Sequence, residues 1–152
     1  MTLPIDFAAG TTRFGIPYLF PAQAQKEFFV NAANSLLDVL LHANVLGIAD
    51  LPPSDPAESE GWIVGSSPED IWTGRENTLA FWIEGGWRHV SPVPGMRVFD
   101  HSTGRSVYFD GAWFTTEAPD APTGGATIDE EARTTISEII EILRSNGFFS
   151  RN

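Results

Sequence analysis

The sequence of 152 residues contains no cysteine. This absence excludes disulfide bonds, thiol catalysis and zinc held by cysteine. Basic residues are also scarce, with nine Lys and Arg against 20 Asp and Glu and a formal net charge of −11. Lys26 is the single lysine, and no basic cluster is present. The composition therefore disfavours binding to nucleic acid and to anionic membrane surfaces.

Long apolar runs are missing as well. No segment approaches the roughly 20 apolar residues that span a bilayer, and the N-terminus lacks a basic region followed by an unbroken apolar stretch. We therefore expect a protein that is made in a cytoplasm and is not exported by the general route. The hydrophobic fraction of 42% supplies enough large side chains for a core without disulfides or a metal.

The order of elements predicts an α+β fold: an N-terminal arm and helix, a small antiparallel β module, and a C-terminal helix. Proline suits a first helical turn and glycine a helix end; the first helix is therefore expected between Pro21 and Gly47. Thr127 and Glu130 form a capping box for the last helix, and Asn146-Gly147 ends it. The expected segments are an extended arm (1–20), a helix (21–47), a linker (48–60), the β module (61–116), a second linker (117–126) and the C-terminal helix (127–152).

The β module contains an approximate internal repeat. GWIV, TGR and LAFWIEGGW in the first copy match GMRV, TGR and SVYFDGAW in the second. In both copies a strand leads into a tight glycine turn that a tryptophan closes, and glycine supplies the positive φ of such turns. We expect two related hairpin units, because one hairpin alone cannot bury a face.

The N-terminal arm and the first helix carry more apolar surface than the small β module can cover. Large apolar residues recur in the arm, and they fill a wide stripe of the first helix. The arm is expected to bind across its own module or across a partner, and the helix to be covered on more than one side. This pattern predicts a homo-oligomer in which the following residues contribute to assembly: Phe14, Ile16, Tyr18, Phe20, Phe28, Phe29, Leu36 and Leu40.

Aromatic residues crowd the β module, and most are expected in its core. Strand alternation places Phe81 with Ile83, and Val107 with Phe109, on the core side. Trp82 and Tyr108 occupy matching repeat positions on the opposite face. Such a pair is predicted either to stack on sugar rings or to be covered by a helix or a neighbouring subunit.

No catalytic, metal or cofactor site is predicted. Asp100-His101-Ser102 contains the residue types of a triad, but consecutive residues cannot place orienter, base and nucleophile in hydrogen-bonded order. DHSTG is expected to be a hairpin loop. The carboxylates are scattered through loops, so a glycan hydrolase is only a remote alternative, and the sequence contains neither a phosphate-binding glycine loop nor a dinucleotide fingerprint.

Residues 13–116 resemble a family encoded in alphaproteobacterial prophages and gene transfer agents, which are phage-like particles that package DNA. The resemblance rests on PAQAQKE (Pro21 to Glu27), the following Asn31, GWIVG, the Trp72 to Gly74 element and LAFWIEGGWRHVSPVPGMRVFD. It implies a structural protein associated with fibres or spikes, and it supplies no catalytic residues.

The resemblance implies a place on the particle surface and several partners. The expected function is a spike, fibre or adaptor component, assembled as a trimer or pentamer, that contacts capsid or tail proteins and a longer fibre protein. Contact with host capsule polysaccharide is a further implication. The alternative is a carbohydrate-binding module that recognises cell-surface glycan.

Overall fold

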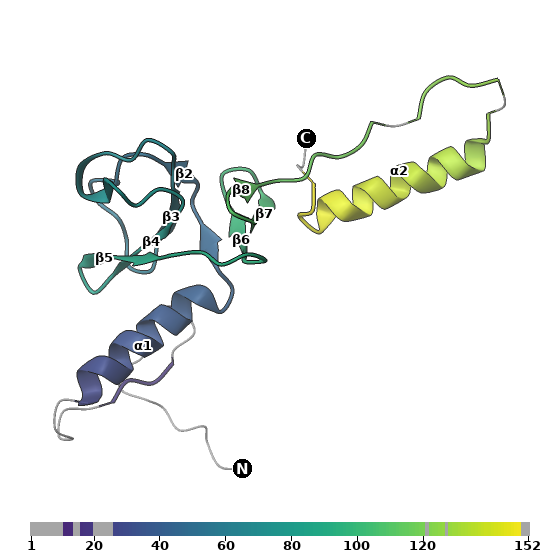
Figure 1. The fold of residues 1–152 in the computed structure, drawn as a ribbon. Helices are drawn as coiled ribbons and strands as arrows, with labels where there is room; N and C mark the ends of the chain where they lie inside the picture. The colour runs from purple at the N-terminus through teal and green to yellow at the C-terminus, as the bar shows by residue number, and fades with distance from the viewer. Residues whose placement is uncertain (1–10, 14–15, 20–25, 121, 127, 150–152) are drawn as a thin grey trace, which may run out of the picture. The chain divides into compact units, whose positions relative to one another are not determined.

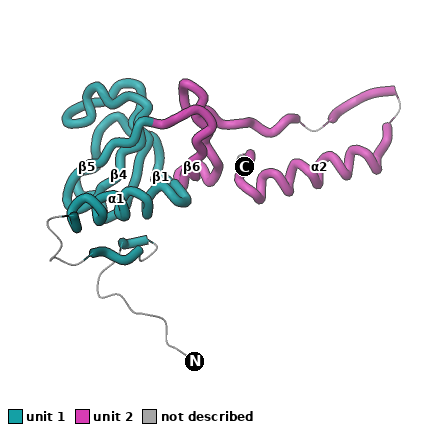
Figure 2. Tube along the Cα trace, turned by 60° about the horizontal axis from the view of Figure 1, so that its bottom comes forward, with its two compact units in different colours: residues 1–91 teal, residues 92–152 magenta. Residues whose placement is uncertain are grey.

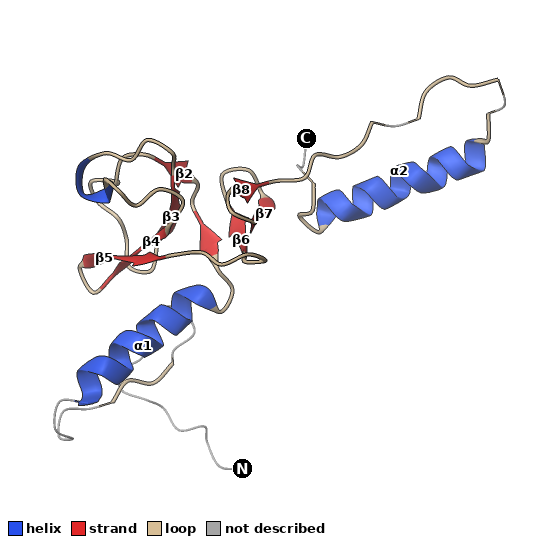
Figure 3. Cartoon of the chain, viewed as in Figure 1, coloured by secondary structure: helices blue, strands red, loops and turns tan. Residues whose placement is uncertain are grey.

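The structure is a computed structural model that describes residues 11–13, 16–19, 26–120, 122–126 and 128–149. The fold is mixed α+β, with helix α1 (Lys26–Leu40) before the strands and helix α2 (Glu130–Ser145) after them (Figures 1 and 3). This arrangement confirms the expected fold class. The chain divides into two compact units, residues 1–91 and residues 92–152, which Figure 2 shows in separate colours.

Unit 1 holds α1, a short 3-10 helix and a four-stranded sheet in the order β2-β3-β4-β5. Strand β2 runs parallel to β3, and the other neighbours are antiparallel. A two-residue turn joins β4 to β5, in which Glu84 and Gly85 both have positive φ (53° and 71°), the combination of a type I′ turn. The elements are β1 (Asn44–Val45), β2 (Ile48–Ala49), β3 (Gly61–Val64), η1 (Asp70–Trp72), β4 (Leu79–Ile83) and β5 (Gly86–Val90).

Strand β4 is buried on both of its faces. Leu79, Phe81 and Ile83 alternate on one side and are at most 3% exposed, which confirms the core position expected for the last two. On the other side, Ala80 packs in a buried cluster with Val64 and Trp72. The loop that carries η1 therefore covers this second face from within the same unit.

Unit 2 repeats the antiparallel pattern with three short strands, β6 (Arg97–Asp100), β7 (Arg105–Phe109) and β8 (Trp113–Phe114). The strands β3-β4-β5 and β6-β7-β8 are the two related hairpin units that the sequence repeat predicts, and one lies in each compact unit. Val107 is buried, whereas Phe109 is half-buried against Trp113 at a ring separation of 5.1 Å.

The DHSTG segment forms the predicted hairpin loop between β6 and β7. Asp100 is 3% exposed, and its carboxylate accepts hydrogen bonds from the backbone N–H of Ser102 (2.8 Å) and from the hydroxyls of Ser102 (2.7 Å) and Thr103 (2.8 Å). The aspartate thus stabilises the turn. His101 is exposed and lies against the ring of Phe99.

Helix α2 ends as the sequence predicts. Gly147 has a φ of 75°, its N–H donates to Arg144 O, and the N–H of Phe148 donates to Leu143 O. This is a Schellman motif, which satisfies the last helical carbonyls. Gly147 O then accepts a hydrogen bond from Ser106 N on β7 (2.8 Å), so this end of α2 is fixed to the sheet of unit 2.

Three expected boundaries were wrong. Helix α1 ends at Leu40 rather than near Gly47, and the residues that follow it form β1 and β2, so the strands begin before Gly61. Helix α2 begins at Glu130 with Asp129 as its N-cap, because the Asp129 carboxylate accepts the Ala132 N–H (2.9 Å). Thr127, the expected cap, lies outside the described residues.

Candidate functional site

A buried carboxylate holds the N-terminal arm on helix α1. Asp38 is 1% exposed and points toward residues 11–13 of the arm. Its carboxylate accepts a hydrogen bond from the Thr11 hydroxyl (2.6 Å) and another from the Arg13 backbone N–H (2.8 Å). The described part of the arm therefore binds the chain's own helix α1, whereas the surfaces expected for it were the module and a partner.

Arg13 also closes the C-terminal end of α1. Its guanidinium donates to the carbonyls of Asp38 (3.2 Å), Val39 (2.9 Å) and His42 (2.8 Å). The last carbonyls of a helix lack intrahelical partners and carry partial negative charge. A cation at this position satisfies both requirements and stabilises the C-terminal end of the helix.

Residues 16–19 continue along the helix through polar contacts. The Tyr18 hydroxyl bonds to the Ser35 hydroxyl (2.6 Å), and the Asn34 side chain donates to Pro17 O (3.0 Å). The Asn31 amide accepts from Leu19 N (2.8 Å) and donates to Leu19 O (3.1 Å). Polar side chains thus fasten the arm, so its attachment leaves apolar residues of α1 uncovered.

The uncovered apolar residues of α1 form the candidate assembly surface. Phe28 is 69% exposed and Phe29 is 82% exposed. Leu36 and Leu40 are half-buried, and Ile16 and Tyr18 are half-buried on the arm; Phe14 and Phe20 lie outside the described residues. The α1 apolar surface comprises the large apolar side chains of α1, and of the residue directly after it, that are at least 40% exposed: Phe28, Phe29, Val30, Leu37 and Leu41.

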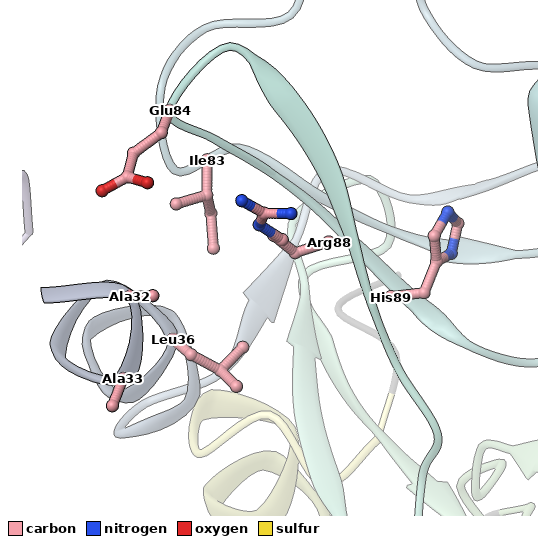
Figure 4. A pocket seen from close by; sticks show the side chains of 7 residues that line it. All are labelled: Ala32, Ala33, Leu36, Ile83, Glu84, Arg88 and His89. Carbon is pink, nitrogen blue, oxygen red and sulfur yellow. The ribbon is translucent and has the colours of Figure 1, made fainter. Parts of the chain in front are cut away.

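A cavity of about 300 Å³ lies between α1 and the β4–β5 hairpin (Figure 4). Ala32, Ala33 and Leu36 line it from the helix, and Ile83 faces them from β4. Glu84, Arg88 and His89 complete the lining. The cavity therefore has an apolar wall on the helix side and at Ile83, and a polar wall formed by Glu84, Arg88 and His89.

Trp82 belongs to an aromatic cluster on the sheet face of unit 1 that lies opposite Phe81 and Ile83. It pairs directly across the hairpin with Trp87, and their ring centroids are 5.2 Å apart. Trp87 also makes edge contacts with Trp62 (5.6 Å) and with the fully buried Trp72 (4.9 Å). Trp82 is half-buried, and its contact with Trp87 is a packing contact.

Tyr108 lies in unit 2 and belongs to a stack that crosses the three strands. The Arg97 guanidinium lies 4.6 Å from the Tyr108 ring centroid and 5.1 Å from that of Phe148. Phe114 stacks with Tyr108 at 5.8 Å and is itself 50% exposed. Trp82 and Tyr108 are thus in different units, and each lies in its own aromatic cluster. We name the second one the Arg97 ladder (Phe148, Arg97, Tyr108, Phe114).

Metal-ligating side chains do not gather in the described part of the chain, where no group of three His, Asp or Glu residues is placed to hold a metal ion. Burial and then the positive charge of Arg75 lower the pKa of His89, whose Nδ1 bonds to the Thr78 hydroxyl (3.2 Å). In the same described residues, no helix is long and apolar enough to cross a membrane.

Sequence reasoning missed the polar attachment of the arm. Asn31, Ser35 and Asp38 lie at spacings of four and three, so they share one face of α1 and form a polar stripe within an apolar helix. That stripe was a usable signal for a polar partner. The prediction for this helix used only the spacing of its apolar residues and therefore did not include the polar stripe. Arg97 and Phe114 were also missed, because their cross-strand positions depend on the register of β6, β7 and β8.

Residues 30–115 match the model of a family described as Protein of unknown function (DUF2793). The match begins within α1 and ends just after β8, so it covers both hairpin units. No curated protein matches the chain.

Proposed function

Because this chain belongs to the DUF2793 family of unknown function, we propose a function from its surfaces: a non-enzymatic structural component of a phage-like particle. It acts as a spike, fibre or adaptor subunit at the particle surface. Its partners are copies of itself, capsid or tail proteins, and a longer fibre protein. The bacterial cytoplasm is the place of synthesis.

The α1 apolar surface carries the proposal. A surface helix normally turns large apolar residues toward the core, but here Phe29 is 82% exposed and Leu41 is 57% exposed. Val30, Leu37 and Leu41 follow spacings of seven and four, so they share one face of the helix, and exposed apolar groups of this kind are typical of protein–protein contacts. The arm supports the same reading, because Asp38 and Arg13 hold it on another part of the helix and leave these side chains accessible.

The resemblance of PAQAQKE and the following helix to the prophage and gene transfer agent family supports the particle as the place of assembly. That distinctive run directly precedes α1 and includes its first two residues, Lys26 and Glu27. The most distinctive sequence therefore ends on the element that carries the most exposed apolar side chains. Attachment of the protein to the particle through α1 would explain both the distinctive sequence and the exposed apolar side chains.

Incorporation into particles tests the proposal. Particles are purified from a strain that carries the gene, and the deleted gene is replaced by wild type, Leu37→Ser or Ile71→Ser. Leu37 (52% exposed) belongs to the α1 apolar surface, whereas Ile71 (62% exposed) lies on η1 and serves as the matched control. Mass spectrometry is expected to find wild type and Ile71→Ser in the particles and much less of Leu37→Ser.

Three results would each contradict a part of the proposal. If the wild-type protein is absent from purified particles, it is not a particle component. If Leu37→Ser is incorporated as well as Ile71→Ser, α1 is not the attachment surface. Shortened polysaccharide chains after incubation of the pure protein with capsule would refute the non-enzymatic assignment.

Glycan binding is the second candidate, and the exposed Phe114 ring favours it. Phe114 ends the Arg97 ladder with half of its side chain accessible, and aromatic rings of this kind can stack on the apolar faces of sugars. Pull-down with capsulated cells compares wild type with Trp82→Ala, Tyr108→Ala and Phe114→Ala. If all three variants bind the cells as well as wild type does, the proposed glycan-binding function is wrong.

A further inference from the structure

Helix α2 exposes most of its apolar residues within unit 2. Ile140 is its one buried residue, at 7% exposure. Ile136 is 42% exposed, Ile139 is 50% exposed and Ile142 is 60% exposed. The Schellman motif and the Ser106–Gly147 hydrogen bond hold the C-terminal end of the helix on β7, so the isoleucines of the preceding turns face solvent in the single chain.

The composition of α2 argues that another chain covers these turns. Its 16 residues include six β-branched ones, which have lower helix propensity than Leu, Glu or Lys. Isolated helices of about 12 to 15 residues are marginal in water even when rich in alanine. A helix with this composition therefore depends on packing, and its own unit supplies that packing mainly at one end.

The charges of α2 identify the kind of partner. Ala132, Ile136, Ile139 and Leu143 follow spacings of four, three and four, the a/d pattern of a helical seam. In this register its glutamates, Glu130, Glu131, Glu138 and Glu141, all occupy b, c and f positions, away from the seam. A chain with a net charge of −11 repels its own copies least at surfaces that carry no carboxylates, and the seam is such a surface.

The two arginines of α2 are also engaged. Arg133 donates to the carbonyls of Pro122 and Gly124, and Arg144 pairs with Glu141 at 2.6 Å. A basic partner would be drawn to the glutamate face of the helix instead of to the uncharged seam. The uncharged apolar seam therefore suits the same seam of another copy of the chain.

We propose that α2 is the self-association element of this protein: three copies pack their α2 helices in parallel along Ile136, Ile139 and Leu143. Isoleucine at both a and d positions favours three or four strands over two, and three is the smaller closed assembly. The inference rests on the proposed structural function and specifies its homo-oligomeric partner. A seam of two heptads is short, so the three attached modules contribute by aligning the helices.

Sedimentation velocity of the full chain over a wide concentration range tests the inference. Ile139→Glu places a carboxylate in the seam, and Ser137→Glu places the same carboxylate at an exposed b position two residues away. Wild type and Ser137→Glu are expected to form trimers. Ile139→Glu is expected to need at least about tenfold more protein for assembly, because a charge in an apolar contact is costly. Since Ile139 is half-exposed, tryptophan fluorescence should report the same fold for each.

The outcomes separate this inference from the proposed function. If Ile139→Glu assembles like wild type, α2 is not the seam, and the particle role through α1 is untouched. If wild type is monomeric at every concentration, the inference fails, and so does the homo-oligomer of the proposed function. A wild-type trimer that is lost in Ile139→Glu but is absent from particles would support the seam and refute the particle role.

Discussion

Substitution of the buried Asp38 tests how the N-terminal arm is attached to helix α1. Asp38→Ala removes the acceptor of two hydrogen bonds, one from the Thr11 hydroxyl and one from the Arg13 N–H. A hydrogen bond to a charged group contributes about 1.5 to 3 kcal/mol. Removing the carboxylate also relieves its own burial, so the free energy of unfolding of unit 1 should fall by about 2 to 4 kcal/mol.

Urea unfolding followed by tryptophan fluorescence measures this change, because four of the five tryptophans lie in unit 1. Thr11→Val removes the hydroxyl that donates to Asp38 and accepts from the Ile16 N–H, and it should cost about 1.5 to 3 kcal/mol. Asp55→Ala, at an exposed loop position, is the control and should lie within about 0.5 kcal/mol of wild type. If Asp38→Ala also lies within that range, the carboxylate does not hold the arm, and the account of arm attachment is wrong.

Three further predictions concern the sheet of unit 1. Gly61→Ala should destabilise by about 1 to 3 kcal/mol in urea unfolding, because a Cβ there would lie 2.4 Å from the buried Phe81 ring; Gly86→Ala meets no atom within 4 Å and should cost less. Trp72→Ala should lower the free energy of unfolding by about 3 to 5 kcal/mol in the same measurement, because packing around the buried ring is lost. Trp72→Phe should lower it clearly less, because the indole nitrogen is buried without a hydrogen-bond partner and its removal breaks no hydrogen bond. Burial and then the positive charge of Arg75 lower the pKa of His89 in the folded chain. The unfolded chain therefore binds a proton at His89 more readily than the folded chain does. The free energy of unfolding should thus be unaffected by this group above about pH 6.5 and should decline as the pH falls below that value. Thermal melting should show a smaller decline in His89→Gln.

The aromatic residues of the two units have different roles. In unit 1, Trp87 contacts Trp62, Trp72 and Trp82, so these rings stabilise one another and the sheet beneath them. In unit 2, the Arg97 ladder lies across three short strands and leaves one ring half-exposed. The matching repeat positions of Trp82 and Tyr108 therefore do not imply matching environments.

Much of the fold could be predicted from local patterns. The α+β class, the two hairpin units and the end of α2 at Asn146-Gly147 all follow from periodicity and turn chemistry, which act over a few residues. The DHSTG loop was predicted for the same reason. At the end of α1 a distant residue contributes: Arg13 caps the helix from 25 or more positions away, and no local rule records that contact. The start of α2 was misplaced although its cap, Asp129, is local.

The sequence by itself determined which residues are apolar, where the turns fall and that no thiol chemistry is possible, because those properties belong to single residues and short spacings. Only the tertiary structure decided which apolar residues remain uncovered. Phe28 and Leu36 share the same helical pattern, yet Phe28 is 69% exposed whereas Leu36 is half-buried beside the β4–β5 hairpin. Exposure depends on what packs against each side chain, and those neighbours are brought together by long-range pairing that the local sequence does not encode.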